Sequence, residues 1–171
     1  MTVTLHDPAH CPLTAGRRRR CWRLLLCVLG ALWLSGPLDA HADSAELLVI
    51  VGSGAGVERL SEEQLAAIFT TTTRHWPNDR AIVAFNLPAK TPLRMDFDRA
   101  VLHMSPEQVG RFWIDRRIRG GETPPREVPE PALVARLIAK LPGSIGYVPE
   151  SVKLDNVRVV ARVRQGKVVA P

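Results

Sequence analysis

Cysteine and histidine are scarce in this chain of 171 residues, which contains three cysteines and five histidines. All three cysteines, Cys11, Cys21 and Cys27, lie near the N-terminus, so the remainder of the chain has neither disulfide nor thiol chemistry. Beyond residue 42 only His75 and His103 remain, and neither has a ligand-like neighbour at the spacing of a metal site. We therefore expect no metal centre and interpret both histidines as surface or capping residues.

Nucleotide-binding and nucleophile motifs are missing as well. No Walker loop occurs, because the only lysine that follows a glycine, Lys167, comes after a lone Gly166. The segment Gly143–Gly146 lacks the Gly-x-Ser-x-Gly pattern of a nucleophile elbow. The glycines of Gly52–Gly56 have the wrong spacing for a dinucleotide fingerprint, so we interpret this segment as a strand exit, with a ligand contact as the alternative. We expect no cofactor and no enzymatic activity.

The apolar run at residues 21–34 falls short of the roughly 20 residues that a membrane-spanning helix needs. A basic block, Arg17–Arg20, precedes this run, and Gly36 and Pro37 break it. The segment Ala40–Ala42 then has the small-x-small pattern of a signal peptidase site. A basic start, a short apolar core and such a cleavage pattern are typical of a signal peptide.

These features predict a Sec-type signal peptide over residues 1–42 and export to the periplasm of a mature chain that begins near Asp43. A membrane anchor, a lipoprotein modified at Cys27 and a twin-arginine signal are alternatives that fit less well. Removing the signal takes away five of the 23 basic and two of the 17 acidic residues, which lowers the net charge from +6 to +3. Charge therefore gives no reason to expect a nucleic-acid partner. Residues 43–171 are enough for a single compact domain.

Local signals place three helices in this domain. Ser61 and Gln64 form a capping-box pattern at the start of the first helix. The segment Met104–Val109 repeats this pattern, with a proline at the first helical position. The third helix follows the proline-rich stretch Thr123–Pro129 and stops at Pro142-Gly143. Its apolar stripe consists of Leu133, Val134, Leu137, Ile138 and Leu141.

Short apolar runs indicate the strands. Leu47–Val51 and Ala81–Phe85 are continuous runs, which suit strands covered on both faces, and Ile145–Val148 is a shorter one. The segment Val157–Val163 alternates with arginines as an exposed or edge strand does, and Gln165-Gly166 can turn it back as a hairpin. Strands interleaved with helices indicate an α/β fold with a mostly parallel or mixed sheet flanked by helices.

Four arginines lie between residues 111 and 119, with aromatic and aliphatic residues between them. On a helix this arrangement gives an amphipathic element with a charged outer face, where Asp115 can pair with Arg111 or Arg119. We interpret the segment as a solvated face and keep a binding patch for an acidic partner as the alternative. The arginines are Arg111, Arg116, Arg117 and Arg119.

Two segments resemble a known family. Leu60–Phe69 followed by Trp76, and Leu141–Val148 with the sequence LPGSIGYV, are similar to segments of the phosphate-binding-protein-like branch of the type II periplasmic substrate-binding proteins. In that family these segments frame the second of two lobes, and the anion is buried between the lobes. The resemblance extends over roughly residues 45–151, and a chain of this length is expected to hold one such lobe.

The family's anion motif, Gly-Ser-Gly-Thr at the start of a helix, falls here on Lys90-Thr91-Pro92-Leu93, and Arg94 follows. The resemblance implies that Thr91 caps this helix and that the amides of Leu93 and Arg94 donate to an anion. It also implies that the positive charges of Lys90 and Arg94 attract the anion.

The chain departs from this motif at several positions. Pro92 deletes a backbone donor, and Leu93 stands where the family has a threonine hydroxyl. Asn86 or Leu87 replaces the arginine that usually precedes the motif. The same residues equally fit a helix start that binds nothing.

Two functions remain open at this point. In the first, the protein is an exported solute-binding protein, of the kind that serves ABC transporters, and it captures phosphate or a similar oxyanion through residues 90–94. In the second, the lobe is a non-transport interaction or sensing module. It then meets a periplasmic or membrane protein through the arginine-rich segment or through an exposed sheet edge.

Overall fold

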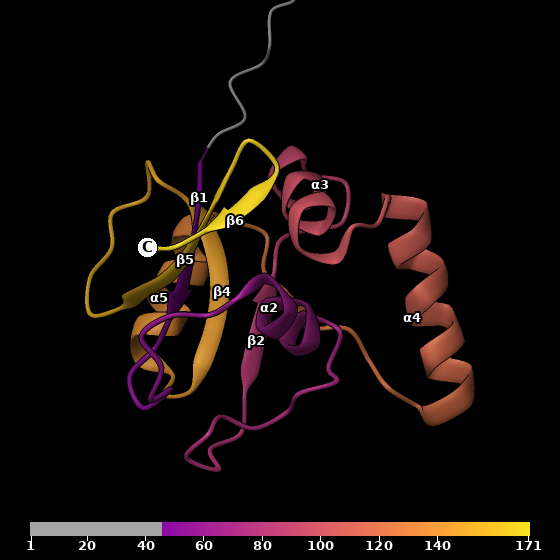
Figure 1. The fold of residues 1–171 in the computed structure, drawn as a ribbon, viewed down its shortest axis with the longest axis horizontal. Helices are drawn as coiled ribbons and strands as arrows, with labels where there is room; N and C mark the ends of the chain where they lie inside the picture. The colour runs from indigo at the N-terminus through magenta and orange to yellow at the C-terminus, as the bar shows by residue number, and fades with distance from the viewer. Residues whose placement is uncertain (1–45) are drawn as a thin grey trace, which may run out of the picture. The chain divides into compact units, whose positions relative to one another are not determined.

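The computed structural model describes residues 46–171, so the predicted signal peptide lies outside the described residues. Six strands form one sheet in the order β3-β2-β4-β1-β5-β6 (Figure 1). The strands are β1 (Leu47–Val51), β2 (Val83–Asn86), β3 (Arg126–Glu127), β4 (Ser144–Pro149), β5 (Arg158–Arg164) and β6 (Lys167–Val169). The helical elements are α2 (Glu62–Phe69), α3 (Pro92–Phe97), the π-helical turn η1 (Asp98–Leu102), α4 (Pro106–Gly120) and α5 (Pro131–Lys140). None of these helices is long and apolar enough to cross a membrane.

The sheet is mixed, which is one of the two arrangements expected from the sequence. Strand β2 runs parallel to both β3 and β4. Strand β1 is antiparallel to β4 and to β5, and β5 is antiparallel to β6. The carboxyl ends of β2, β3 and β4 therefore lie along one edge of the sheet, and the carboxyl end of β1 lies along the opposite edge.

The hairpin predicted at Gln165-Gly166 is confirmed. Both residues have positive φ, 50° and 73°, as a two-residue turn of type I′ requires, and glycine adopts such a φ without strain. The sequence indicates an exposed or edge strand at Val157–Val163. The edge alternative is wrong, because β6 pairs with β5 and takes the edge itself. The exposed alternative holds at the ends of β5, where Arg158 and Arg164 are exposed, whereas its centre is buried.

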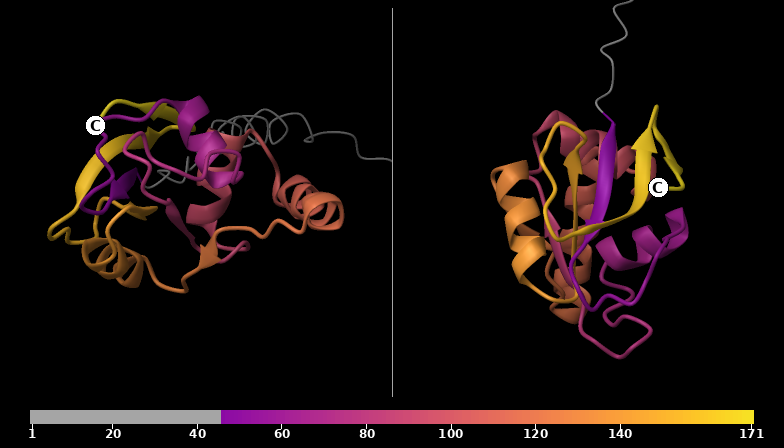
Figure 2. Two further views of the ribbon diagram at one scale, coloured as in Figure 1. Left: turned by 90° about the horizontal axis from the view of Figure 1, so that it is seen from below. Right: turned by 90° about the vertical axis from the view of Figure 1, so that its left-hand side faces the viewer.

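Both faces of the sheet are covered near its centre. Helix α5 packs along β4 on one face, and α2 lies on the other face (Figure 2). This explains why β1 is a continuous apolar run, since all five of its residues are buried. On the α2 side the ring of Phe97 stacks on Tyr147 at a centroid distance of 3.8 Å, and Phe69 meets Phe97 edge-on at 4.7 Å.

The predicted helix starts at Ser61 and Ser105 are confirmed. Each serine accepts a hydrogen bond from the amide of the glutamine three residues later, and each glutamine side chain accepts one from the serine amide. Helix α5 begins at Pro131 and ends at Lys140, just before Pro142-Gly143, as the stripe predicted.

Helix α4 stands to one side of the sheet (Figures 1 and 2). Only Val109 and Trp113 of this helix are buried. Its C-terminal end is held by Glu122, whose carboxylate binds Arg116 and lies 2.6 Å from Arg74 in the loop after α2. The predicted pairing within the helix occurs between Arg119 and Asp115, at 2.9 Å.

Candidate functional site

The junction between β2 and α3 lies at the sheet edge where the carboxyl ends of the parallel strands meet. The chain leaves β2 at Asn86, passes through residues 87–91 and enters α3 at Pro92. In open α/β sheets ligands bind beyond the carboxyl ends of the strands, so this junction is in the expected place for a site.

The start of α3 differs from the family-like arrangement that the sequence implied. Thr91 occupies the N-cap position with an extended backbone, but its side chain makes no capping hydrogen bond. Its hydroxyl donates instead to the carbonyl oxygen of Pro88 at 2.8 Å. The predicted capping role of Thr91 is therefore wrong: its hydroxyl oxygen accepts no hydrogen bond from the first turn, because the bond to Pro88 directs the side chain toward the preceding turn.

The missing cap leaves two backbone donors available. Within residues 46–171 the amides of Leu93 and Arg94 have no acceptor, whereas the amide of Met95 donates to the carbonyl of Thr91 at 3.0 Å. Unsatisfied amides and the helix dipole together give a helix start partial positive charge. Helix α5 also lacks a side-chain cap, so an open start by itself is not specific for α3.

The side chains around this start point in different directions. Lys90 is exposed and carries a full positive charge beside the helix start. Leu93 is half-buried and packs against the apolar core, so it contributes its amide and not its side chain. Lys90 is therefore the one side chain of the predicted site that is placed to attract an anion from solution.

Arg94 points into the molecule rather than toward solvent. Its side chain is 4% exposed, and its Nε donates to Oδ2 of Asp98 at 2.6 Å. Its Nη1 donates to the carbonyl of Leu87 at 3.1 Å and, when the side-chain amide of Asn86 is turned with its oxygen toward Arg94, to Asn86 at 2.9 Å. The guanidinium is therefore not placed to contact an external anion, contrary to what the resemblance implied. Of Arg94, only the backbone amide remains available to such a ligand.

The buried network continues from Arg94 to Tyr147. The Tyr147 hydroxyl accepts from the amide of Leu87 at 3.3 Å, so Leu87 is held through both its carbonyl and its amide. Burial raises the pKa of Tyr147, which keeps its hydroxyl neutral. Burial also raises the pKa of Asp98, and this effect outweighs the opposing charge of Arg94. One oxygen of Asp98, Oδ1, is buried without a hydrogen-bond partner among the described residues.

Comparison with solved structures finds a similar fold in two proteins named for phosphate transport. One match is a protein from Clostridium perfringens, assigned as a phosphate ABC transporter substrate-binding protein and solved with bound phosphate, with a TM-score of 0.54 and 18% identity. It aligns over 69% of this chain and 46% of its own. An ABC-type phosphate transport receptor from Vibrio cholerae matches with a TM-score of 0.53 and 16% identity, over 69% of this chain and 47% of its own.

No family model and no curated protein matches the sequence. The chain spans less than half the length of the two phosphate-binding proteins, and identities this low establish the fold alone. The fold predicted from the two motifs, one lobe of a type II periplasmic binding protein, is confirmed by these matches. The Clostridium perfringens protein is named a substrate-binding protein, and the Vibrio cholerae protein is named a transport receptor.

Sequence reasoning missed three residues that shape the junction: Asn86 as a partner, Asp98 and Tyr147. The spacing of Arg94 and Asp98, four residues apart in a helical segment, is a signal that local analysis can detect. That spacing does not say that the pair is buried. Burial depends on packing against residues such as Tyr147, which is distant from the pair in sequence.

Proposed function

We propose that residues 43–171 form an exported solute-binding-like lobe that binds a small oxyanion, such as phosphate, at the start of α3. The observation that carries this proposal is the pair of open amides at Leu93 and Arg94, next to an exposed lysine at the carboxyl edge of the parallel strands. The likeness of the fold to proteins named for phosphate transport supports the choice of ligand class.

The buried network gives these amides a defined direction. Arg94 ties the α3 turn to Leu87 and Asp98, so the backbone that carries the donors is held from beneath. A preorganised donor pair at the positive end of the helical segment binds an anion better than the same groups on a mobile loop, because less ordering is needed on binding. Lys90 then adds a charge-assisted contact from the exposed side.

The expected affinity is low. Two amides and one ammonium replace few of the water molecules around a phosphate, and Pro92 has no amide to give. With net contributions of roughly 1.5 kcal/mol for each hydrogen bond to a charged group, three contacts correspond to a dissociation constant of about 1 mM. A second lobe or a second protein chain would be needed to bury the anion as the two-lobed family does.

The test is a titration of residues 43–171 with phosphate, sulfate and acetate, followed by amide chemical shifts. Phosphate is expected to shift the Leu93 and Arg94 signals in a saturable way. Lys90→Gln should weaken this binding several-fold, because it removes the exposed charge. Lys153→Gln, which alters another exposed lysine far along the chain, is the matched control and should leave the binding unchanged. Absence of saturable shifts at residues 93 and 94 would contradict the proposal.

A second candidate function, an interaction module, is favoured by the outer face of α4. Ile114 and Ile118 are 63% and 80% exposed, one helical turn apart on the face turned away from Trp113. Arg111 and Arg117 on the same helix have no carboxylate partner among the described residues. Exposed isoleucines beside unpaired arginines suit an acidic protein surface with an apolar centre.

A photocrosslinking residue placed at position 118 tests this second candidate in cells. A discrete crosslinked protein that disappears when Ile114 is changed to Ser and Arg117 to Glu would support an interaction role. Crosslinking that is weak, heterogeneous and unaffected by these changes would leave solute binding as the function.

A further inference from the structure

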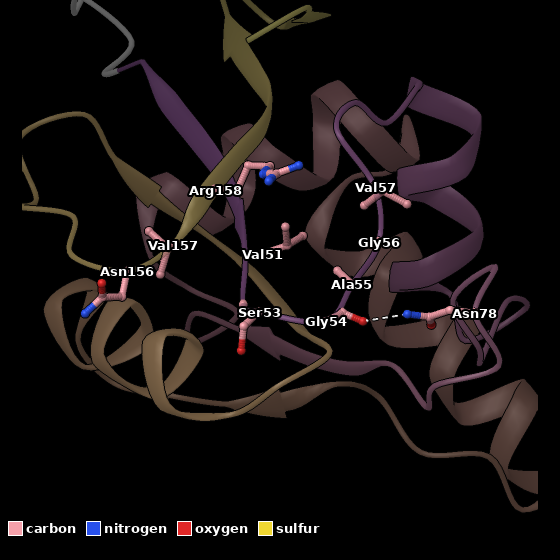
Figure 3. A pocket seen from close by; sticks show the side chains of 11 residues that line it. Val51, Ser53, Gly54, Ala55, Gly56, Val57, Asn78, Asn156, Val157 and Arg158 are labelled. Atoms are coloured by element: carbon pink, nitrogen blue, oxygen red, sulfur yellow. Dashed lines mark hydrogen bonds between the residues drawn. The ribbon is translucent and has the colours of Figure 1, made fainter.

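A polar cavity lies at the end of the strands opposite the start of α3. It has a volume of about 440 Å³ and is formed by the loop that leaves β1, by Asn78 and by the start of β5 (Figure 3). Strand β1 is antiparallel to β4, whose direction β2 shares, so this cavity and the proposed site at α3 lie at opposite ends of the strands. A ligand here would not contact Lys90 or the α3 amides.

The loop after β1 presents a run of backbone donors. Among the described residues, the amides of Ser53, Gly54, Ala55, Gly56 and Val57 donate to no backbone or side-chain acceptor. The loop carbonyls are in part occupied: that of Ser53 accepts from the amide of Gly143 at 2.8 Å. The carbonyl of Gly54 accepts from Asn78 Nδ2 at 2.9 Å (Figure 3). The loop therefore has two of its carbonyls engaged, while its five amides are open.

The loop after β1 has a specific backbone conformation and one buried residue. Gly54 and Gly56 have φ values of 77° and 70°, with Ala55 between them at an ordinary φ. Glycine adopts such φ values without strain, so these two positions let the chain turn sharply here with its amides unengaged. Ala55 is buried, so the loop is anchored at its centre. A side chain at position 54 would come within 3.0 Å of Arg80, which packs against the loop.

Arg158 supplies a full positive charge to the same cavity. It is the first residue of β5 and pairs with Val51, the last residue of β1, so the sheet register brings its side chain to the mouth of the loop. Its nearest carboxylate is that of Glu58, at 3.9 Å, and both side chains are mostly exposed. This contact is too long for a strong hydrogen bond, so the guanidinium remains available to a ligand.

The rest of the lining is mixed. Asn78 and Asn156 bring side-chain amides to the cavity, and Val51 and Ala55 are almost completely buried. Aliphatic surface comes from Val57 and Val157, which are half-buried (Figure 3). An inorganic oxyanion would use the donors but not these side chains, and it would fill only part of a space of this volume. A ligand with an anionic head and a short aliphatic body matches both kinds of lining.

We infer that this cavity binds a small organic anion. Open amides of residues 53–57 and the guanidinium of Arg158 bind its carboxylate or phosphate group, and Val57 and Val157 contact its aliphatic body. The site is independent of the oxyanion site at α3. It also gives a function to a glycine-rich segment whose spacing fits no nucleotide-binding motif.

Amide chemical shifts of the folded protein, residues 43–171, test this inference during titration with three probes: butyrate, glycerol 3-phosphate and inorganic phosphate. Saturable shifts are expected at residues 53–57 with butyrate or with glycerol 3-phosphate, and inorganic phosphate should bind more weakly there than the better of the two. Which organic probe binds more tightly tells whether the anionic head is a carboxylate or a phosphate.

Two variants and their controls assign the contacts. Arg158→Gln should weaken the binding of the organic probe at least about tenfold, since a charge-assisted contact is lost. Arg136→Gln, at an exposed arginine on α5, should change nothing. Ser53→Asp places a competing carboxylate beside the open amides and should abolish binding, whereas Ser53→Asn should retain it. Residues 53 and 158 are exposed, so these variants are expected to fold.

The outcomes separate this site from the proposed one. Shifts at residues 93 and 94 alone would uphold the oxyanion site at α3 and overturn this inference. Shifts at residues 53–57 that persist unchanged in Arg158→Gln, or the absence of saturation with any probe, would also overturn it. Saturable shifts at residues 53–57 that are lost in Arg158→Gln and in Ser53→Asp, with none at residues 93 and 94, would establish this site and contradict the proposed function.

Discussion

Nε of Arg94 lies 2.6 Å from Oδ2 of Asp98, and both side chains are almost completely buried. The pair joins α3 to the π-helical turn η1 and lies beneath the loop that we propose as an oxyanion site. Arg94 also holds the carbonyl of Leu87, so it links two successive turns of helix to the end of β2. The guanidinium of Arg94, which the resemblance implied would attract the anion, is instead the internal support of the proposed site.

Removing Arg94 is therefore expected to destabilise the fold before it affects binding. Arg94→Leu leaves the Asp98 carboxylate buried without its partner, which should lower the free energy of unfolding by about 3–5 kcal/mol. Urea denaturation followed by far-UV circular dichroism measures this loss. In the double variant Arg94→Leu, Asp98→Leu no charge remains buried, so most of the stability should return. A single variant as stable as the wild type would mean that the pair is not buried.

Asp98 should also give the protein an unusual dependence on pH. Burial raises the pKa of this carboxyl in the folded state, so between the unfolded and the folded pKa the folded protein binds more protons than the unfolded chain. The stabilisation from this group is complete below the unfolded value and is lost as the pH rises through the folded one.

The comparison of wild type with Asp98→Asn isolates this effect. Their difference in free energy of unfolding, measured by urea titration from about pH 3.5 to 7, should shift in favour of Asp98→Asn as the pH rises. The surface carboxylates Glu46 and Glu122, whose pKa values are lowered by hydrogen bonds from arginines, act in the opposite direction in both proteins and so cancel. A difference that is constant with pH would contradict the raised pKa.

The open start of α3 predicts a gain of function from one substitution. Pro92→Ala adds a backbone amide at the first helical position, next to the amides of Leu93 and Arg94. If the oxyanion binds there, calorimetric titration should show phosphate binding up to about tenfold tighter, the worth of one further hydrogen bond to a charged group. Unchanged affinity would show that phosphate does not contact the first turn of α3.

The two kinds of helix start should respond differently to loss of their hydroxyl groups. Ser61→Ala removes a side-chain cap and should lower the free energy of unfolding by about 1 kcal/mol. Thr91→Ala removes only the contact with the Pro88 carbonyl, a bond within one turn, so a smaller loss is expected. Thermal unfolding of the two variants provides the comparison, and an equal or larger loss for Thr91→Ala would restore the capping role that the sequence suggested.

The fold could be predicted largely from local patterns. The capping boxes at Ser61 and Ser105, the stripe of α5 and the hairpin turn at Gln165-Gly166 each depend on residues a few positions apart, and each is present in the structure. The resemblance of Leu60–Phe69 and Leu141–Val148 to a binding-protein lobe added the arrangement of these elements, which similarity to solved structures supports.

The oxyanion site at Lys90–Arg94 stays a prediction, and its geometry differs from what the sequence implied. The structure places this segment beyond the carboxyl ends of the parallel strands. The sequence did not indicate that Thr91 donates to Pro88 or that Arg94 points inward. Both outcomes depend on the tertiary packing around the loop, where Leu87 is held by Tyr147 from another strand.

By itself the sequence determined the helix starts and ends, the apolar strands and the turn of the last hairpin. The physical reason is that caps, stripes and turns satisfy the backbone through neighbours within about four residues. Only the tertiary structure decided that β1 runs antiparallel beside β4, that the glycine loop and Arg158 line one cavity, and that the charge of Arg94 is internal. These features depend on burial and on contacts between residues far apart in the chain. Local sequence patterns allow either strand direction and either side-chain orientation, and burial of apolar surface in the core favours one of them.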